Sequence, residues 1–266
     1  MAWRPYSQLL KAGFKRQSRY RLAMFAGLVT NAVFGLIRAS VLGAAVMSAG
    51  GELAGYGFGE MMTYVWLGQA LLGSVNLWGR TDLTERVRSG DIAVDYARPC
   101  SVVGSYLASD LGAALYVLVP RGVPALTIGW AVFGLSFAAD PLNWALAPLS
   151  LLLGILTAQL VVYLVALLGF WTVETRGFIA AYATMSSFFA GLVVPVWLMP
   201  EWLRAVAHLT PWPSMLQSPL DILSGRLTGV DAVAACATQV LWFGLATGAV
   251  SGLARLGRRH LQVQGG

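Results

Sequence analysis

Polar side chains inside long apolar stretches are the first residues of this sequence whose types could do chemistry. A polar or ionisable group in an apolar environment is costly, so it usually faces other protein or a water-filled path. Seven such residues are candidates for lining a polar path: Asn31, Arg38, Gln69, Asn76, Arg121, Tyr182 and Ser186. Helix packing through interhelical hydrogen bonds is the alternative role, and the two arginines could instead extend toward a membrane surface.

The spacing of these polar residues places several of them on shared helix faces. Asn31 and Arg38 are seven residues apart, so a helix would present them on one face together with Gly27 and Gly35. The next apolar stretch has a comparable stripe, made of Gln69, Gly73, Asn76 and Arg80. Asp110 is a candidate counter-charge for a basic residue, although its partner does not follow from spacing.

Residues 80–99 form a charged segment between two apolar stretches, and their pattern predicts a short helix. Gly90 is suited to the left-handed turn that ends a helix, Asp91 is suited to cap the next turn, and Pro99 marks a further break. Leu83 and Val87 are four residues apart and would form an apolar ridge. Such a helix is suited to docking against a soluble partner, and a solvated loop is the alternative. The candidate docking residues are Leu83, Glu85, Arg86, Val87, Arg88, Gly90 and Asp91.

The residue types of enzyme active sites do not gather in this sequence. His208 and His260 are far apart and have no metal-binding spacing, and the two cysteines have none either. A phosphate-binding loop requires a lysine that follows a glycine, whereas Lys11 and Lys15 follow leucine and phenylalanine. We therefore expect no enzyme activity, cofactor or metal site in this chain.

The composition indicates lipid as the solvent for most of the chain. Hydrophobic residues make up 57% of the 266 residues and charged residues only 11%, against roughly a quarter charged in ordinary soluble domains. The mean hydropathy is +0.67, and the apolar residues form long runs. The formal net charge of +6 is explained by basic residues beside membrane helices, so nucleic-acid binding is not expected.

Six apolar stretches are long enough to cross a bilayer, whose hydrocarbon core of about 30 Å needs about 20 helical residues. They cover residues 23–47, 61–79, 105–137, 143–171, 178–199 and 231–254. The third stretch is too long for one straight crossing and contains Pro120, Gly122 and Pro124. We therefore expect it to start along the cytoplasmic surface, to kink, and to form one tilted span.

The distribution of basic residues predicts the orientation of these spans. With the N-terminus inside, fourteen of the eighteen Lys and Arg residues fall in cytoplasmic segments, whereas only Arg204 and Arg226 fall outside. Cytoplasmic loops of membrane proteins are enriched in Lys and Arg, which favours this orientation. An even number of spans then places both termini in the cytoplasm.

Several short motifs follow one another in a recognisable order along the chain. They are Trp3-Arg4-Pro5-Tyr6, Tyr64-Val65-Trp66-Leu67-Gly68-Gln69, Glu85-Arg86-Val87-Arg88-Ser89-Gly90-Asp91 with Arg98-Pro99, Val194-Pro195, and Met199-Pro200-Glu201-Trp202-Leu203. In this order they resemble the permease subunits of ATP-binding-cassette (ABC) exporters of the ABC-2 type, over nearly the whole chain. Within that class the chain is similar to a bacterial branch of short, six-span permeases, often encoded as two related proteins beside one ATPase gene.

The resemblance implies an all-α integral membrane fold with six transmembrane helices. It places a cytoplasmic interfacial connecting helix in residues 1–22, the six-helix membrane domain in 23–254 and a basic cytoplasmic tail in 255–266. Residues 82–91 match the coupling helix, and residues 200–226 match short re-entrant elements outside the membrane. The residues themselves also favour an interfacial helix, since Tyr6, Leu9, Leu10 and Phe14 lie near one helical face.

The resemblance also implies a function, which is export driven by ATP hydrolysis in a separate chain of a bacterial cytoplasmic membrane. The implied partners are two ABC ATPase subunits that bind ATP and Mg²⁺, a second permease chain that is either related or a second copy, and membrane lipids. The expected substrate is a small amphipathic or hydrophobic molecule, a lipid or a glycan. An ion-coupled secondary transporter and a non-transporting membrane scaffold are the alternatives, although the sequence shows no inverted repeat.

Overall fold

The structure is a computed structural model that describes residues 4–172 and 174–260. Trp3 of the first motif and residues 261–266 of the predicted basic tail lie outside the described residues. The elements, in chain order, are α1 Arg4–Gln17, α2 Arg21–Ser48, β1 Glu52–Leu53, β2 Tyr56–Gly57, α3 Phe58–Leu71, α4 Asp82–Ser89, α5 Ile92–Tyr96, α6 Val102–Val117, a π-helical turn Leu118–Gly122, α7 Val123–Phe133, α8 Pro141–Leu167, a 3₁₀ turn Leu168–Phe170, α9 Arg176–Phe189, a 3₁₀ turn Val196–Leu198, α10 Glu201–His208, α11 Trp212–Met215, α12 Gln217–Ser224, α13 Gly229–Gly257 and a 3₁₀ turn Arg258–His260.

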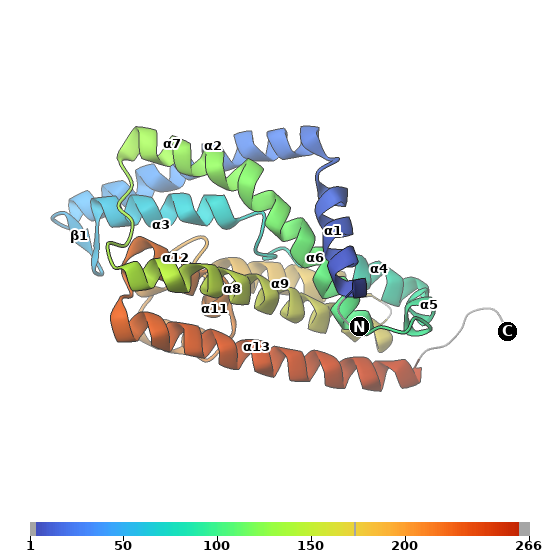
Figure 1. The fold of residues 1–266 in the computed structure, drawn as a ribbon. Helices are drawn as coiled ribbons and strands as arrows, with labels where there is room; N and C mark the ends of the chain where they lie inside the picture. The colour runs from blue at the N-terminus through green and yellow to red at the C-terminus, as the bar shows by residue number, and fades with distance from the viewer. Residues whose placement is uncertain (1–3, 173, 261–266) are drawn as a thin grey trace.

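Four helical stretches within the described residues are long and apolar enough to cross a membrane. They are Met24–Ser48, Val102–Phe133, Pro141–Phe170 and Gly229–Gly257, which correspond to the first, third, fourth and sixth predicted spans. α2, α8 and α13 run along a common direction, with α8 between the other two (Figure 1). Its central place agrees with its sequence, because α8 is the most apolar and the most buried of the four stretches. The protein is therefore an all-helical membrane protein.

The second and fifth predicted spans are helical over a shorter length than expected. α3 ends at Leu71 and α9 at Phe189, rather than near residues 79 and 199. Each helix has 14 residues, or about 21 Å, against about 30 Å of hydrocarbon. Gly79 and Gly191 in the following segments have φ values of +70° and +82°, a left-handed backbone that interrupts a helix.

The kink predicted in the third stretch is confirmed. α6 gives way to a π-helical turn that contains Pro120, and α7 follows it. Proline has no backbone N–H and cannot continue the regular helical hydrogen bonds, which accounts for the wide turn. The chain changes direction there, so α6 packs beside α1 whereas α7 packs beside α2 and α3 (Figure 1).

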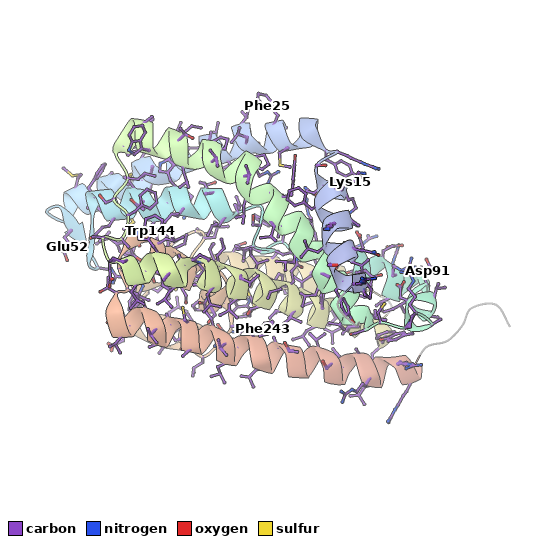
Figure 2. The ribbon with its side chains drawn as sticks, in the orientation of Figure 1. Lys15, Phe25, Glu52, Asp91, Trp144 and Phe243 are labelled. Carbon is purple, nitrogen blue, oxygen red and sulfur yellow. The ribbon has the colours of Figure 1, made fainter. Side chains whose placement is uncertain are left out.

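The two ends of the helix bundle carry different elements. One end holds α4, α5 and the last turns of α13, and the β1–β2 hairpin lies at the other (Figure 1). Asp91 and Glu52 mark these two ends in Figure 2. The segment in which re-entrant elements were expected contains α10, α11 and α12. α12 packs against α3 and α8, and its Leu220 and Ile222 are fully buried.

The hairpin is held to the segment after α9 by one buried carboxylate. Asp221 accepts hydrogen bonds from the Tyr56 hydroxyl at 2.9 Å, the Trp197 indole at 2.7 Å and the Gln217 amide at 2.8 Å. The Arg226 guanidinium lies 4.1 Å from the Tyr56 ring centroid and 4.6 Å from that of Trp197. These contacts fix the path of the chain beyond Gly191.

Close helix packing attaches α1 to α6. A Cβ atom at Gly112 would overlap the Leu10 carbonyl and lie 3.0 Å from the Phe14 nitrogen, and one at Gly13 would overlap the Ser109 carbonyl. Glycine at these two positions therefore allows the two backbones to touch. The Tyr6 hydroxyl adds a contact by accepting a hydrogen bond from the Ser101 nitrogen at 3.1 Å.

Gly112→Leu should detach α1, because the new side chain would occupy space filled by the α1 backbone. We expect a cost of about 1–3 kcal/mol in stability, seen as a lower melting temperature in detergent and faster tryptic cleavage after Lys11 and Lys15. Gly248→Leu is the matched control, since a Cβ atom there meets nothing within 4 Å. Equal stability of the two variants would contradict this packing.

Candidate functional site

A cavity of about 1110 Å³ lies between α2, α3, α6 and α8. Non-helical backbone completes its wall, from residues 72–76 after α3 and residues 192–193 after α9. Apolar side chains such as Phe34, Leu72 and Val117 line it together with polar ones such as Thr30 and Gln159. Its volume is comparable with that of small-molecule binding sites, and its wall suits an amphipathic guest.

Five of the seven residues predicted to line a polar path surround this one cavity. They are Asn31, Arg38, Gln69, Asn76 and Arg121. They come from α2, α3, the segment after α3 and the π-helical turn, so the fold gathers residues that are distant in the sequence. The shared helix faces predicted from their spacing therefore point to a common space.

Tyr182 and Ser186 support the cavity wall and are not among the residues that line it. The Tyr182 hydroxyl donates to the Asn76 carbonyl at 2.7 Å, and the Ser186 hydroxyl donates to the Leu77 carbonyl at 2.7 Å. These carbonyls belong to non-helical backbone and need donors from elsewhere. The structure therefore places both side chains behind the cavity wall, and their predicted place in a transport path stays a prediction.

Hydrogen bonds between elements engage part of the polar stripe, as the packing interpretation predicted. The Asn31 amide donates to the Gln69 carbonyl at 3.3 Å, which joins α2 to α3. The Asn76 amide donates to the Gln159 side chain at 3.0 Å and to the Arg80 carbonyl at 2.7 Å. These residues therefore line the cavity and also hold its walls together.

Arg38 and Arg121, two of the three arginines that line the cavity, are partly buried and poorly partnered. All three guanidinium nitrogens of Arg38 expose less than 1 Å² each and make no hydrogen bond within the described chain, and the same holds for Nε of Arg121. Glycines leave room for both groups: a Cβ atom at Gly68 would lie 3.7 Å from Arg38, and one at Gly73 would lie 3.0 Å from Arg121. Arg38 therefore does not extend to a membrane surface.

The short helix predicted in the charged segment is confirmed as α4. The Thr81 hydroxyl accepts a hydrogen bond from the Leu83 nitrogen at 3.2 Å at its start, and Gly90 ends it with φ of +80°. Asp91 occupies the position before α5, but its side chain makes no capping hydrogen bond. The predicted Asp91 cap is therefore wrong, and the carbonyl of this residue instead accepts a bond from Arg86 at 3.1 Å.

The apolar ridge of α4 faces the protein's own membrane domain. Leu83 is fully buried and Val87 is 7% exposed, in a cluster with Leu160, Tyr163 and Leu167 of α8. The expectation that these two side chains offer a ridge to a soluble partner is therefore wrong. Burying both apolar side chains stabilises the attachment of α4 to α8, so the exposed side of α4 is its charged side.

An ion-pair network that the sequence interpretation missed braces α4 against α5 and α6. Arg86 donates to both oxygens of Asp95, at 2.6 and 3.2 Å, and the Tyr106 hydroxyl donates to Asp95 at 2.9 Å. The bond to Asp95 raises the pKa of Arg86. Arg98 approaches the same carboxylate at 3.5 Å. Nothing in the sequence marks this pairing, because the partners lie on separate helices.

Glu85 and Arg88 are exposed charges of α4 that pair only with each other among the ion pairs of the described residues. They pair with each other at 2.9 Å, with side chains 66% and 52% exposed. The hydrogen bond from Arg88 lowers the pKa of Glu85, so this carboxylate stays charged at neutral pH. An exposed pair of this kind contributes little to folding, which leaves both charges available to a partner.

A second network connects α4 with α1, α6 and the cavity. Arg16 of α1 pairs with Asp82 at the start of α4 and approaches Asp110 of α6 at 3.8 Å. Asp110 also accepts a hydrogen bond from the Tyr163 hydroxyl at 2.7 Å and lines the cavity. The prediction that Asp110 is a counter-charge is confirmed, and its partner is Arg16.

Two comparisons with known proteins bear on the family to which this chain belongs. A search of curated proteins found no match for the chain. The family model described as ABC-2 family transporter protein matches residues 34–255, which is most of the chain and includes α3 to α12. The chain therefore belongs to the ABC-2 transporter family and is a membrane permease without an ATPase domain of its own.

Proposed function

We propose that this permease carries its substrate through the cavity, driven by separate ATPase subunits that dock on α4. The observation that carries the proposal is the connection between the two sites. Asp82 at the start of α4 pairs with Arg16, and Arg16 pairs with Asp110 in the cavity wall. A displacement of α4 would therefore reach the cavity through charged contacts as well as through the buried ridge.

The proposed topology has six crossings with both termini in the cytoplasm. In this arrangement α3 with residues 72–79, and α9 with residues 190–199, complete the second and fifth crossings. Irregular backbone at membrane depth is tolerated where it is buried in protein or lines a cavity, and both segments contribute to the cavity wall. The position of α4, α5 and the end of α13 at one end of the bundle supports a common cytoplasmic side (Figure 1).

The proposed transport unit contains two permease chains and two ATPase subunits, which bind ATP and Mg²⁺. The second permease chain is either another copy or a related protein, and the pathway lies at or near the contact between the two. Large apolar side chains on α2, such as Phe25 at 64% and Val41 at 63% exposure, support a face covered by lipid or by this partner.

The proposed direction is export, as in the exporters that the sequence resembles. The mixed cavity wall suits a small amphipathic or hydrophobic molecule, a lipid or a glycan.

Replacing Glu85 and Arg88 with alanine should weaken docking of the ATPase without unfolding the permease. Truncating a charge in a desolvated contact typically costs about 2–5 kcal/mol, whereas an exposed pair contributes little to folding. The measurements are copurification of a coexpressed partner ATPase and its substrate-stimulated hydrolysis. Arg255→Ala, an exposed cation at the same end of the bundle, is the control; Arg258 is unsuitable because it lies over the Tyr96 ring at 5.4 Å. Full assembly and full hydrolysis in the double variant would refute α4 as the docking site.

The topology is tested with single cysteines at Glu52 and Arg259, after Cys100 and Cys236 are replaced by alanine. Both positions are exposed, and neither requires a left-handed backbone. A membrane-impermeant maleimide should label Glu52→Cys in intact cells and Arg259→Cys only after permeabilisation. The reverse pattern, or labelling of both in intact cells, would rule out the proposed orientation.

A further inference from the structure

Arg38 is a buried cation for which the described chain supplies no anion. It lies on α2, its guanidinium lies near Gly68, and its three nitrogens are buried without a hydrogen-bond partner. The ion pairs of the described residues do not include Arg38. Burying an unpaired charge is among the most costly arrangements in a protein, so its persistence indicates a partner that comes from outside the chain.

The cavity in which Arg38 lies has an excess of positive charge. Arg38, Arg80 and Arg121 line it, and Asp110 is the acidic residue in its wall. The Asp110 carboxylate is already engaged by Tyr163 and Arg16. The phenol of Tyr64, which interacts electrostatically with Arg38, donates its hydroxyl to Gln217 at 2.6 Å. No carboxylate of the cavity is therefore free to neutralise Arg38.

Arg38 and Arg121 meet different parts of the cavity wall, since the Arg38 guanidinium lies near Gly68 and that of Arg121 near Gly27 and Gly73. Arg121 lies against Gly27, which precedes Arg38 by eleven residues of α2, or about 16 Å of helix. Apolar side chains, Phe34 and Val117 among them, contribute to the wall together with these cations. A guest with one anionic group and an apolar body matches this combination of charge and surface.

We propose that the cavity binds an amphipathic anion, with Arg38 as the residue that contacts its phosphate, sulfonate or carboxylate group. A guanidinium can donate two parallel hydrogen bonds to such a group, which satisfies the nitrogens that the fold leaves unpaired. The apolar part of the ligand then lies against the hydrophobic wall. This assignment deepens the proposed function, because it names the chemical class of the substrate, and it rests on the cavity being the substrate pathway.

The test measures binding to the purified chain in a neutral maltoside detergent, without any ATPase. One arm supplies phosphatidylglycerol and phosphatidylcholine in equal amounts and counts the lipids retained by native mass analysis. The other arm titrates 1-anilinonaphthalene-8-sulfonate and follows its fluorescence. Selective retention of phosphatidylglycerol alone identifies a lipid headgroup as the ligand, saturable dye binding alone identifies a free organic anion, and either result supports the proposal.

Arg38→Gln should weaken the anion binding at least about tenfold, the loss expected for a hydrogen bond to a charged group. Arg38→Lys keeps the charge but loses the two-pronged geometry, so its affinity should fall between those of the wild type and Arg38→Gln. Arg176→Gln, which removes a cation that is 82% exposed and outside the cavity, should bind like the wild type.

Wild-type affinity in Arg38→Gln, or no preference for the anion in the wild-type chain, would overturn the proposal. If Arg38→Gln does not fold, Arg38→Lys decides, and unchanged affinity in that variant counts against the assignment. Because no ATPase is present, a failure of docking at α4 would leave this result intact. The two proposals can therefore fail separately.

Discussion

The early ends of α3 and α9 are the constraint on which the rest of the structure depends. When α3 stops at Leu71, the backbone polar groups that follow need partners from other elements. The Tyr182 and Ser186 hydroxyls satisfy the carbonyls of residues 76 and 77, while the Ser74 hydroxyl donates to the Ala114 carbonyl at 3.0 Å. Continuous helices would need no such partners. The cavity wall forms because α3 and α9 end early and the non-helical segments that follow are hydrogen-bonded to neighbouring elements.

Buried apolar contacts and ion pairs together hold α4 against the membrane domain. Leu83 and Val87 are buried against α8, Asp95 joins Arg86 to Tyr106, and Arg16 joins α4 to α1 and α6. The Glu85–Arg88 pair lies on the exposed side of α4. Because these contacts restrain α4, a displacement of α4 would move the helices that contact it rather than bend α4 alone.

Local patterns in the sequence predicted part of this arrangement, whereas contacts between residues distant in the sequence were not predicted. Gly90 marked the end of α4, and Pro120 marked the kink, because each residue constrains its own backbone. The spacing of Asn31, Arg38, Gln69 and Asn76 placed them on faces that do meet at one cavity. Hydropathy overstated α3 and α9, since it measures composition and not hydrogen-bond continuity. The ion pair of Asp95 was not predicted, because its partners lie on other helices. Leu83 and Val87 were predicted to face a soluble partner, because an amphipathic helix does not show which of its neighbours covers its apolar side.

The distance along the chain between the cavity and α4 explains how these features act together. Gly73 lines the cavity, Gly79 makes a left-handed turn, and α4 begins at Asp82. Fewer than ten residues, held at residues 74, 76 and 77 by hydrogen bonds, therefore join this part of the cavity wall to α4. A slack linker of that length would absorb a displacement, whereas a linker fixed at three points passes it on. In the proposed mechanism this segment has two roles, since the residues that leave α3 to form the cavity wall also lead to α4.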